Sequence, residues 1–219
     1  KGLSFDSVGK LNMQLGLNSF SAGDAINKLE QKELEKIFKF FGDEKEGKYI
    51  AKNIVKGRIN KKIDTQDLVK IIDNSKRRKN FRVNNSTKVF QALRIFVNKE
   101  FSELINGLIE ATKLIKSGGK IIVISFHSLE DKIVKFFFTN YSKNKSKVSR
   151  YLPDLSKGNT LFENYKNKIV IPSSEEIIKN NASRSAKLRY ITRCKNDFFY
   201  PNDLKKEFIK YLEVEDRYV

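Results

Sequence analysis

The chain has 219 residues, of which 44 are lysine or arginine and 26 are aspartate or glutamate, so its formal net charge is +18 at pH 7. A 39% share of hydrophobic residues suffices for one large or two small folded domains and excludes a disordered or fibrous protein. A single cysteine excludes an internal disulfide. With one histidine and no long apolar run, we expect a cytoplasmic protein with no metal and no membrane partner.

The N-terminal third of the sequence predicts a loop followed by a small helical domain. Residues 1–20 mix glycine, serine and asparagine without an apolar period, so we expect a loop there. Ser21 followed by Asp24 is typical of a capping box and opens the first of four short helices. The second helix is expected to stop at Gly42, and apolar residues spaced three or four apart predict the third and fourth.

Half of the net positive charge lies in the second part of this helical region. Between Lys45 and Arg82 there are 13 basic and 4 acidic residues, which leaves a net charge of +9. A composition biased by A/T-rich codons would spread lysine evenly, whereas a nucleic-acid site concentrates it. A solvated face is the alternative interpretation of such a run. We expect phosphate contacts first from the densest cluster and second from three later residues: Lys76, Arg77, Arg78, Lys79 and Arg82, then Arg150, Arg184 and Lys187.

Residues 87–140 predict a helix, a strand and a second helix. Apolar residues recur at helical spacing from Thr87 to Ile115, as one long helix or two in series. Residues 121–124 form an unbroken apolar run, which is typical of a strand buried on both faces in the middle of a parallel sheet. Ser128 and Asp131 then resemble a capping box. This order predicts an α/β layered structure with a right-handed crossover.

The rest of the sequence predicts a basic loop, two further strands and a tail. Residues 139–166 are polar and basic, so we expect a loop. Residues 168–171 and 186–194 are expected to form strands, with a helical turn at 174–178 between them. Residues 195–219 are nearly neutral and predict an amphipathic helix at most.

Two groups of side chains are candidates for chemistry. His127 follows the predicted buried strand, where ligands collect in open α/β sheets, but it could equally cap the next helix. Arg184, Lys187 and Arg189 could meet phosphates or pair with nearby acids such as Asp131. The sequence contains no G-x-S-x-G, Walker A or G-x-G-x-x-G motif, so it indicates neither a serine hydrolase nor a nucleotide-binding loop.

Six motifs together resemble the ribosomal RNA small subunit methyltransferase H family. They are K-G-L-S-F at 1–5, L-N-M-Q-L at 11–15, S-A-G-D-A-I-N at 21–27, T-K-V-F-Q-A-L-R-I-F-V-N at 87–98, S-G-G-K-I-I-V-I-S-F-H-S-L-E-D at 117–131 and S-R-S-A-K-L-R at 183–189. They are spread over residues 1–194, and F-Q-A-L-R-I-F-V-N and I-S-F-H-S-L-E-D are the most specific of them. The tail after Cys194 lies outside the common core of that family.

The resemblance implies a class I, S-adenosylmethionine-dependent enzyme that methylates the exocyclic N4 of a cytosine in 16S rRNA. The implied fold is α/β, the C-terminal part of a Rossmann-like methyltransferase sheet at 87–194, with an inserted all-helical, basic RNA-recognition domain at 21–86. Residues 1–20 would be a loop of the methyltransferase domain, and 195–219 an extra tail. The partner would be small-subunit rRNA or the assembling small ribosomal subunit.

The resemblance also places the glycine-rich cofactor loop upstream of Lys1. We therefore expect no cofactor-binding residue within this chain, and we expect the chain to be inactive alone. Family members usually carry aspartate at the positions of Val8 and Asn12 and often arginine at that of Gln14, so electrostatic roles there are in doubt.

Cytosine N4 is a poor nucleophile because its lone pair is delocalised into the ring. The site must therefore position an unstacked base and offer acceptors to the amino hydrogens. By the strand-end rule, Ser125, Phe126, His127 and Ser128 lie near the base pocket, and Asn12 approaches it from the loop. The main alternative is a non-catalytic, basic RNA-binding fragment. A basic ribosomal structural protein is a third possibility, which the predicted buried strand and S-F-H-S-L-E-D disfavour.

Overall fold

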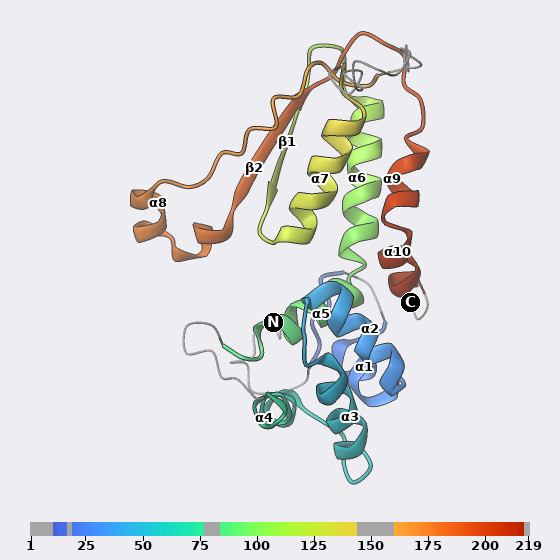
Figure 1. Cartoon of the computed structure of the whole chain (residues 1–219), viewed down its shortest axis with the longest axis vertical. Coiled ribbons are helices and arrows are strands. Elements are labelled where there is room, and N and C mark those ends of the chain that lie inside the picture. The colour runs from blue at the N-terminus through green and yellow to red at the C-terminus, as the bar shows by residue number, and fades with distance from the viewer. Residues whose placement is uncertain (1–10, 17–18, 77–83, 144–159, 217–219) are drawn as a thin grey trace, which may run out of the picture. The chain divides into compact units, whose positions relative to one another are not determined.

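The computed structural model describes residues 11–16, 19–76, 84–143 and 160–216, and the chain divides into two compact units (Figure 1). The first unit comprises residues 1–102 with 210–219, and the second comprises residues 103–209. Helices and a small sheet occur together, so the predicted mixed α/β class is confirmed. No helix in these described ranges is long and apolar enough to cross a membrane.

The elements follow the chain in this order: α1 (Ala22–Lys28), α2 (Gln31–Gly42), α3 (Gly47–Gly57), α4 (Thr65–Ser75), α5 (Thr87–Val97), α6 (Glu100–Leu114), β1 (Lys120–Ser125), α7 (Ser128–Asn140), α8 (Ser174–Lys179), the 3-10 turn η2 (Asn181–Ser185), β2 (Lys187–Thr192), α9 (Asn202–Glu207) and α10 (Ile209–Asp216). The boundary between the units falls inside α6.

The described part of the first unit is helical. The Ser21 hydroxyl accepts a hydrogen bond from the Asp24 amide, and the Asp24 carboxylate accepts one from the Ser21 amide, so the predicted capping box is confirmed. Hydrogen bonds from Lys28 and Ser21 lower the pKa of Asp24 to about 2. α2 packs against α3 and α5. Its predicted apolar face is buried: Leu34, Ile37, Phe38 and Phe41.

The predicted stop of the second helix at Gly42 is confirmed, and Gly42 has a second role in packing. It is the last residue of α2, and a Cβ atom there would lie 2.5 Å from the carbonyl oxygen of Lys88 on α5. Glycine therefore permits the close approach of these two helices. The left-handed residue that follows α2 is Asp43, with a φ of 45°.

The long apolar stretch forms two helices in series, which was one of the two predicted arrangements. Lys99 lies between α5 and α6 with a left-handed φ of 48°. The Arg94 guanidinium donates two hydrogen bonds across this break to the Glu100 carboxylate, at 2.7 and 3.0 Å. These local contacts place the break at a point that apolar spacing alone does not reveal.

The tail forms two short helices where the sequence predicts one at most. At the end of α9, within the second unit, the Phe208 ring lies edge-on to Phe136 with the ring centroids 5.6 Å apart. From residue 210 onward the tail belongs to the first unit. There the Tyr211 ring lies edge-on to Phe40 and Phe101, with centroid distances of 5.6 and 5.7 Å. The tail thus contributes aromatic residues to both units.

The sheet of the second unit differs from the predicted parallel sheet. β1 and β2 pair antiparallel, with Ile122 opposite Tyr190 and Ile124 opposite Leu188. Val170, in a predicted strand, forms an isolated bridge with Leu188. The prediction that β1 is buried on both faces is wrong for this structure, because Ile122 and Ile124 are 60% and 56% exposed. α7 packs against both strands, and within the described residues the opposite face stays open to solvent.

The buried face of β2 is also not the one that its apolar alternation indicates. Tyr190 is 46% exposed, whereas Arg189 and Ile191 are buried. A charged residue can occupy the inner face here because an acid from α7 pairs with it, as described next.

Candidate functional site

The turn between β1 and α7 holds the predicted active-site residues Ser125, His127 and Ser128. His127 is the N-cap of α7, and its Nδ1 accepts a hydrogen bond from the Glu130 amide at 3.4 Å. The Glu130 carboxylate accepts one from the Phe126 amide at 2.8 Å. The capping pair is therefore His127 with Glu130, one residue before the predicted pair. Of the two roles open to His127, helix capping is the one observed.

The His127 ring and the Glu130 carboxylate form a compact pair. The ring Nε2 lies 3.3 Å from the carboxylate Oε1, and the His127 side chain is 10% exposed. Burial opposes ionisation of Glu130, but hydrogen bonds from His127 and from the Phe126 amide outweigh it and lower its pKa. The ionised Glu130 carboxylate thus stabilises the turn between β1 and α7.

The two other predicted residues of this turn have different environments. Ser125 is buried, and its hydroxyl donates to the Lys187 carbonyl at 3.3 Å across the sheet. Ser128 is exposed, and so is the Phe126 ring, at 54%. An exposed ring can stack on a base, and a hydroxyl can donate or accept a hydrogen bond. This turn therefore offers Phe126 and Ser128 to a ligand, whereas Ser125 supports the sheet.

A buried ion pair lies behind the turn. The Arg189 guanidinium donates two hydrogen bonds to the Asp131 carboxylate, at 2.6 and 3.0 Å, and one to the Tyr165 hydroxyl at 2.7 Å. Arg189 lowers the pKa of Asp131, and Asp131 raises that of Arg189. Of the two roles left open for Arg189, pairing with an acid is the one found, and the side chain is 2% exposed.

The two neighbouring cations of the second predicted RNA-binding set are more accessible. Lys187 Nζ lies 3.6 Å from an Asp131 oxygen, and its side chain is 38% exposed. Arg184, in η2, is exposed. Asp131 partly neutralises Lys187, so Arg184 is the better placed of the two for a phosphate contact.

In the densest basic cluster, the structure gives Lys76 a different role from the expected phosphate contact. Lys76 Nζ lies 2.7 Å from the Glu44 carboxylate, with the two side chains 10% and 5% exposed. The same ammonium donates to the Asn85 carbonyl at 2.6 Å. Lys76 therefore holds the helical unit together and is not presented to a phosphate, contrary to the prediction. The other members of the set lie outside the described residues: Arg77, Arg78, Lys79, Arg82 and Arg150.

Asn12 lies in the first unit on a backbone segment that is fixed from two sides. Its side chain is exposed, and its carbonyl accepts a hydrogen bond from the Ala22 amide at 3.0 Å. The Asn98 side chain donates to the Met13 carbonyl at 2.8 Å and accepts from the Leu15 amide at 2.7 Å. Sequence reasoning gave Asn98 no role, and its position at the end of F-Q-A-L-R-I-F-V-N was the available signal.

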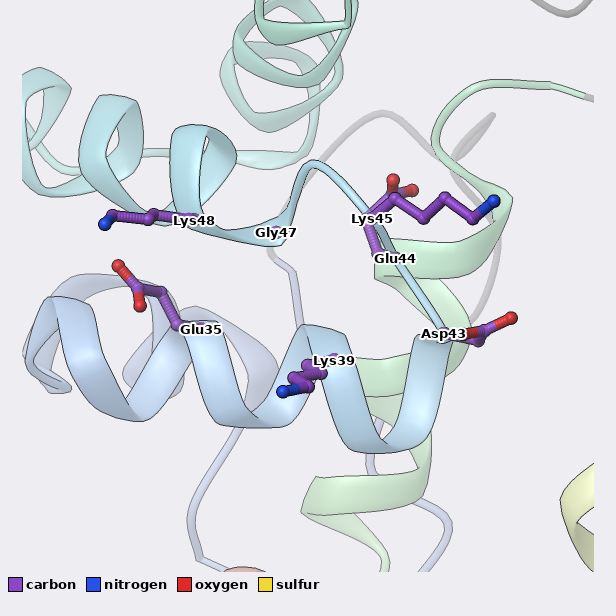
Figure 2. Close-up of a pocket in the computed structure, with 7 residues that line it drawn as sticks. All are labelled: Glu35, Lys39, Asp43, Glu44, Lys45, Gly47 and Lys48. Atoms are coloured by element: carbon purple, nitrogen blue, oxygen red, sulfur yellow. The ribbon is translucent and has the colours of Figure 1, made fainter.

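A hollow of about 400 Å³ lies between α2 and the start of α3 (Figure 2). Figure 2 shows Glu35 and Lys39 on α2 facing this space and Lys48 at its α3 end. Three lysines and three acids line it, so the hollow as a whole does not select an anion. The lining residues are Glu35, Lys39, Asp43, Glu44, Lys45, Gly47 and Lys48.

Comparisons with known proteins match most of this chain. Residues 1–194 match the model of the MraW methylase family. The chain is 40% identical over 203 residues to the ribosomal RNA small subunit methyltransferase H of Bartonella henselae, which covers 91% of the chain and 58% of the relative. The protein of the same name from Bartonella bacilliformis is 43% identical over 200 residues, 90% of the chain and 60% of the relative. That from Agrobacterium fabrum is 40% identical over 191 residues, 86% of the chain and 56% of the relative. The chain thus spans about three-fifths of the length of these relatives.

Proposed function

The chain belongs to the MraW methylase family, and we propose that it is part of an enzyme that methylates small-subunit rRNA. The family match over residues 1–194 carries the proposal, and the relatives named above support it. We further propose that the acceptor is the exocyclic N4 of a cytosine in 16S rRNA and that the methyl donor is S-adenosylmethionine, in the cytoplasm. The proposed fold is a class I, Rossmann-like methyltransferase domain with residues 21–86 inserted as an RNA-recognition domain.

The β1–α7 turn does not fit the methyl donor. Ribose hydroxyls and the amino-acid part of S-adenosylmethionine would need accessible carboxylates and amide groups at a strand end. The Glu130 carboxylate is engaged by the Phe126 amide, and the Asp131 carboxylate by Arg189. We therefore place the cofactor contacts outside the described residues of this chain.

The side chains of this turn suit the target base. We assign the exposed Phe126 ring to stacking on an unstacked cytosine and the Ser128 hydroxyl to accepting a hydrogen bond from its N4 amino group. That hydrogen bond makes the N4 lone pair more available and holds it in line for attack. His127 positions both residues by capping α7. Asn12 remains a candidate base contact, because its side chain is exposed on a fixed segment of the first unit.

The test is a single-turnover assay with the complete protein, small-subunit RNA and tritiated S-adenosylmethionine, followed by digestion to nucleosides. Label is expected in N4-methylcytidine, and label in another nucleoside would contradict the assignment. Ser128→Ala should slow the transfer by about tenfold, the cost of one lost hydrogen bond of about 1 kcal/mol. Phe126→Ala should weaken RNA binding while Phe126→Tyr retains it, because both aromatic rings can stack.

A second candidate function is a non-catalytic RNA-binding chain, which the +18 charge favours. The same assay separates the two functions. A complete protein that binds small-subunit RNA and transfers no methyl group would support the second candidate.

A further inference from the structure

Three lysines and a tyrosine form one exposed stripe on α3. Successive helical residues are about 100° apart, so Lys48, Tyr49, Lys52 and Lys56 lie within an arc of about 100°. The three lysines are exposed, and Tyr49 is 51% exposed. The opposite side of α3 is buried through Ile50, Ala51 and Ile54. The stripe therefore faces solvent along the whole helix.

Acidic residues lie near the stripe at its N-terminal end, where Glu35 of α2 faces the hollow that Lys48 also lines (Figure 2). α3 contains no acidic residue, and within the described residues no ion pair joins its three lysines to a carboxylate. Other cations of the same unit are paired, as Lys61 is with Asp67 at 2.7 Å and Lys76 with Glu44 at 2.7 Å. Some lysines of the basic segment are thus neutralised by acids, whereas the three lysines of α3 are not.

We propose that this α3 stripe is a docking surface for single-stranded RNA. The lysines follow one another at steps of four residues, about 6 Å along the helix, so each can neutralise a different phosphate. Tyr49 stands beside Lys48 and Lys52, where its ring can stack on a base of the same strand. The pairing of lysines with an exposed aromatic ring favours RNA over an acidic peptide, which offers carboxylates and no base to stack on.

The proposal rests on the proposed function because it takes rRNA as the partner. It adds the surface of the chain that contacts the rRNA. It moves the predicted contact from Lys76 to the preceding α3. The hollow described above lies beside the N-terminal end of the stripe, and Lys39, Lys45 and Lys48 are among its lining residues (Figure 2). Because three acids line the same hollow, Lys39 and Lys45 are not counted as part of the stripe.

The test measures binding of the 219-residue chain to a labelled single-stranded RNA of about 12 nucleotides by fluorescence anisotropy over a range of salt concentrations. The variant K48Q/K52Q/K56Q removes three charges from the stripe, and glutamine keeps the helix propensity of lysine. A matched control, K32Q/K36Q/K210Q, removes three exposed lysines from elsewhere in the first unit, none of which forms an ion pair with another described residue. K48R/K52R/K56R keeps the charge.

The stripe variant should bind about tenfold more weakly or worse, and its plot of log affinity against log salt should be shallower by about 2, because each lost contact removes about 0.7 from the slope. The control and the arginine variant should keep the parental slope. Tyr49→Ala should weaken binding by about tenfold at every salt concentration, and Tyr49→Phe should not.

Equal losses in the stripe variant and the control would overturn the proposal, because binding would then follow net charge alone. Equal affinity of the chain for polyglutamate would also overturn it, in favour of an acidic peptide. If the parent binds RNA and the stripe variant binds as well, the stripe fails while the proposed function stands. If the parent shows no salt-dependent RNA binding, the stripe proposal fails, and the methyl-transfer assay of the complete protein decides the proposed function separately. Circular dichroism of each variant ensures that a folding defect is not counted as lost binding.

Discussion

Glu215 provides a sharp test of how the tail is joined to the first unit. Its carboxylate accepts hydrogen bonds from the amides of Phe101 and Ser102 at 3.0 and 2.9 Å and from the Ser102 hydroxyl at 2.6 Å. These amides open α6 and have no partner within that helix, so α10 caps α6. The carboxylate is fully buried. Glu215→Gln keeps the shape of the side chain and removes the charge.

Burial raises the pKa of the Glu215 carboxyl to about 7 from its ordinary 4.5, although its hydrogen bonds favour the ionised form. The folded protein therefore holds this proton more tightly than the unfolded chain does. The stabilisation is fully present below pH 4.5 and is lost as the pH rises through about 7. At about 1.4 kcal/mol for each pKa unit, the loss amounts to about 3 kcal/mol.

The assay is urea unfolding of the parent chain and of Glu215→Gln at a series of pH values, followed by circular dichroism. The free energy of unfolding of the parent minus that of the variant should fall by about 3 kcal/mol as the pH rises from acidic to about pH 8. Taking this difference cancels the other titrating groups. Glu213→Gln is the matched control, because Glu213 is exposed on the same helix and should contribute little. A difference that is independent of pH would refute the reasoning.

Three further predictions concern residues that support the candidate site. Arg189→Ala should lower the free energy of unfolding by about 3–5 kcal/mol, because it leaves Asp131 buried without its main partner. This loss should shrink at acidic pH, where the Asp131 carboxylate becomes protonated. A change below about 1 kcal/mol in urea unfolding would contradict the buried pair. His127→Ala should lower the free energy of unfolding by about 0.5–2 kcal/mol through the lost helix cap, and His127→Asn should restore it. If the complete enzyme with His127→Asn regains methyl transfer, the ring acts by positioning. If it does not, the ring takes part in the chemistry. Asn98→Ala should speed hydrogen exchange at the Leu15 amide, and unchanged exchange measured by NMR would contradict the proposed clamp.

Local patterns predicted much of the helical unit. The Ser21 capping box and the buried face of α2 follow from residues three or four positions apart, and both were found as expected. The faces of β1 did not follow from its sequence, because exposure of Ile122 and Ile124 depends on what packs against the sheet. An apolar run predicts a strand, but it does not show how many of its faces are covered.

The charged residues show a second limit of sequence reasoning. Lys76 and Arg189 both belong to basic segments, yet each is committed to a buried acid far away along the chain, Glu44 and Asp131 respectively. A charge run cannot distinguish a paired lysine from an unpaired one, because that distinction depends on tertiary neighbours. The resemblance of motifs located the β1–α7 turn, but the structure was needed to show that His127 itself is the cap.

The most direct test of the central claim is nucleoside analysis of small-subunit rRNA from cells with and without the gene for this protein. The account predicts that one N4-methylated cytosine is lost when the gene is deleted and returns when the gene is restored. An unchanged level of N4-methylcytidine at every position of that rRNA would contradict it.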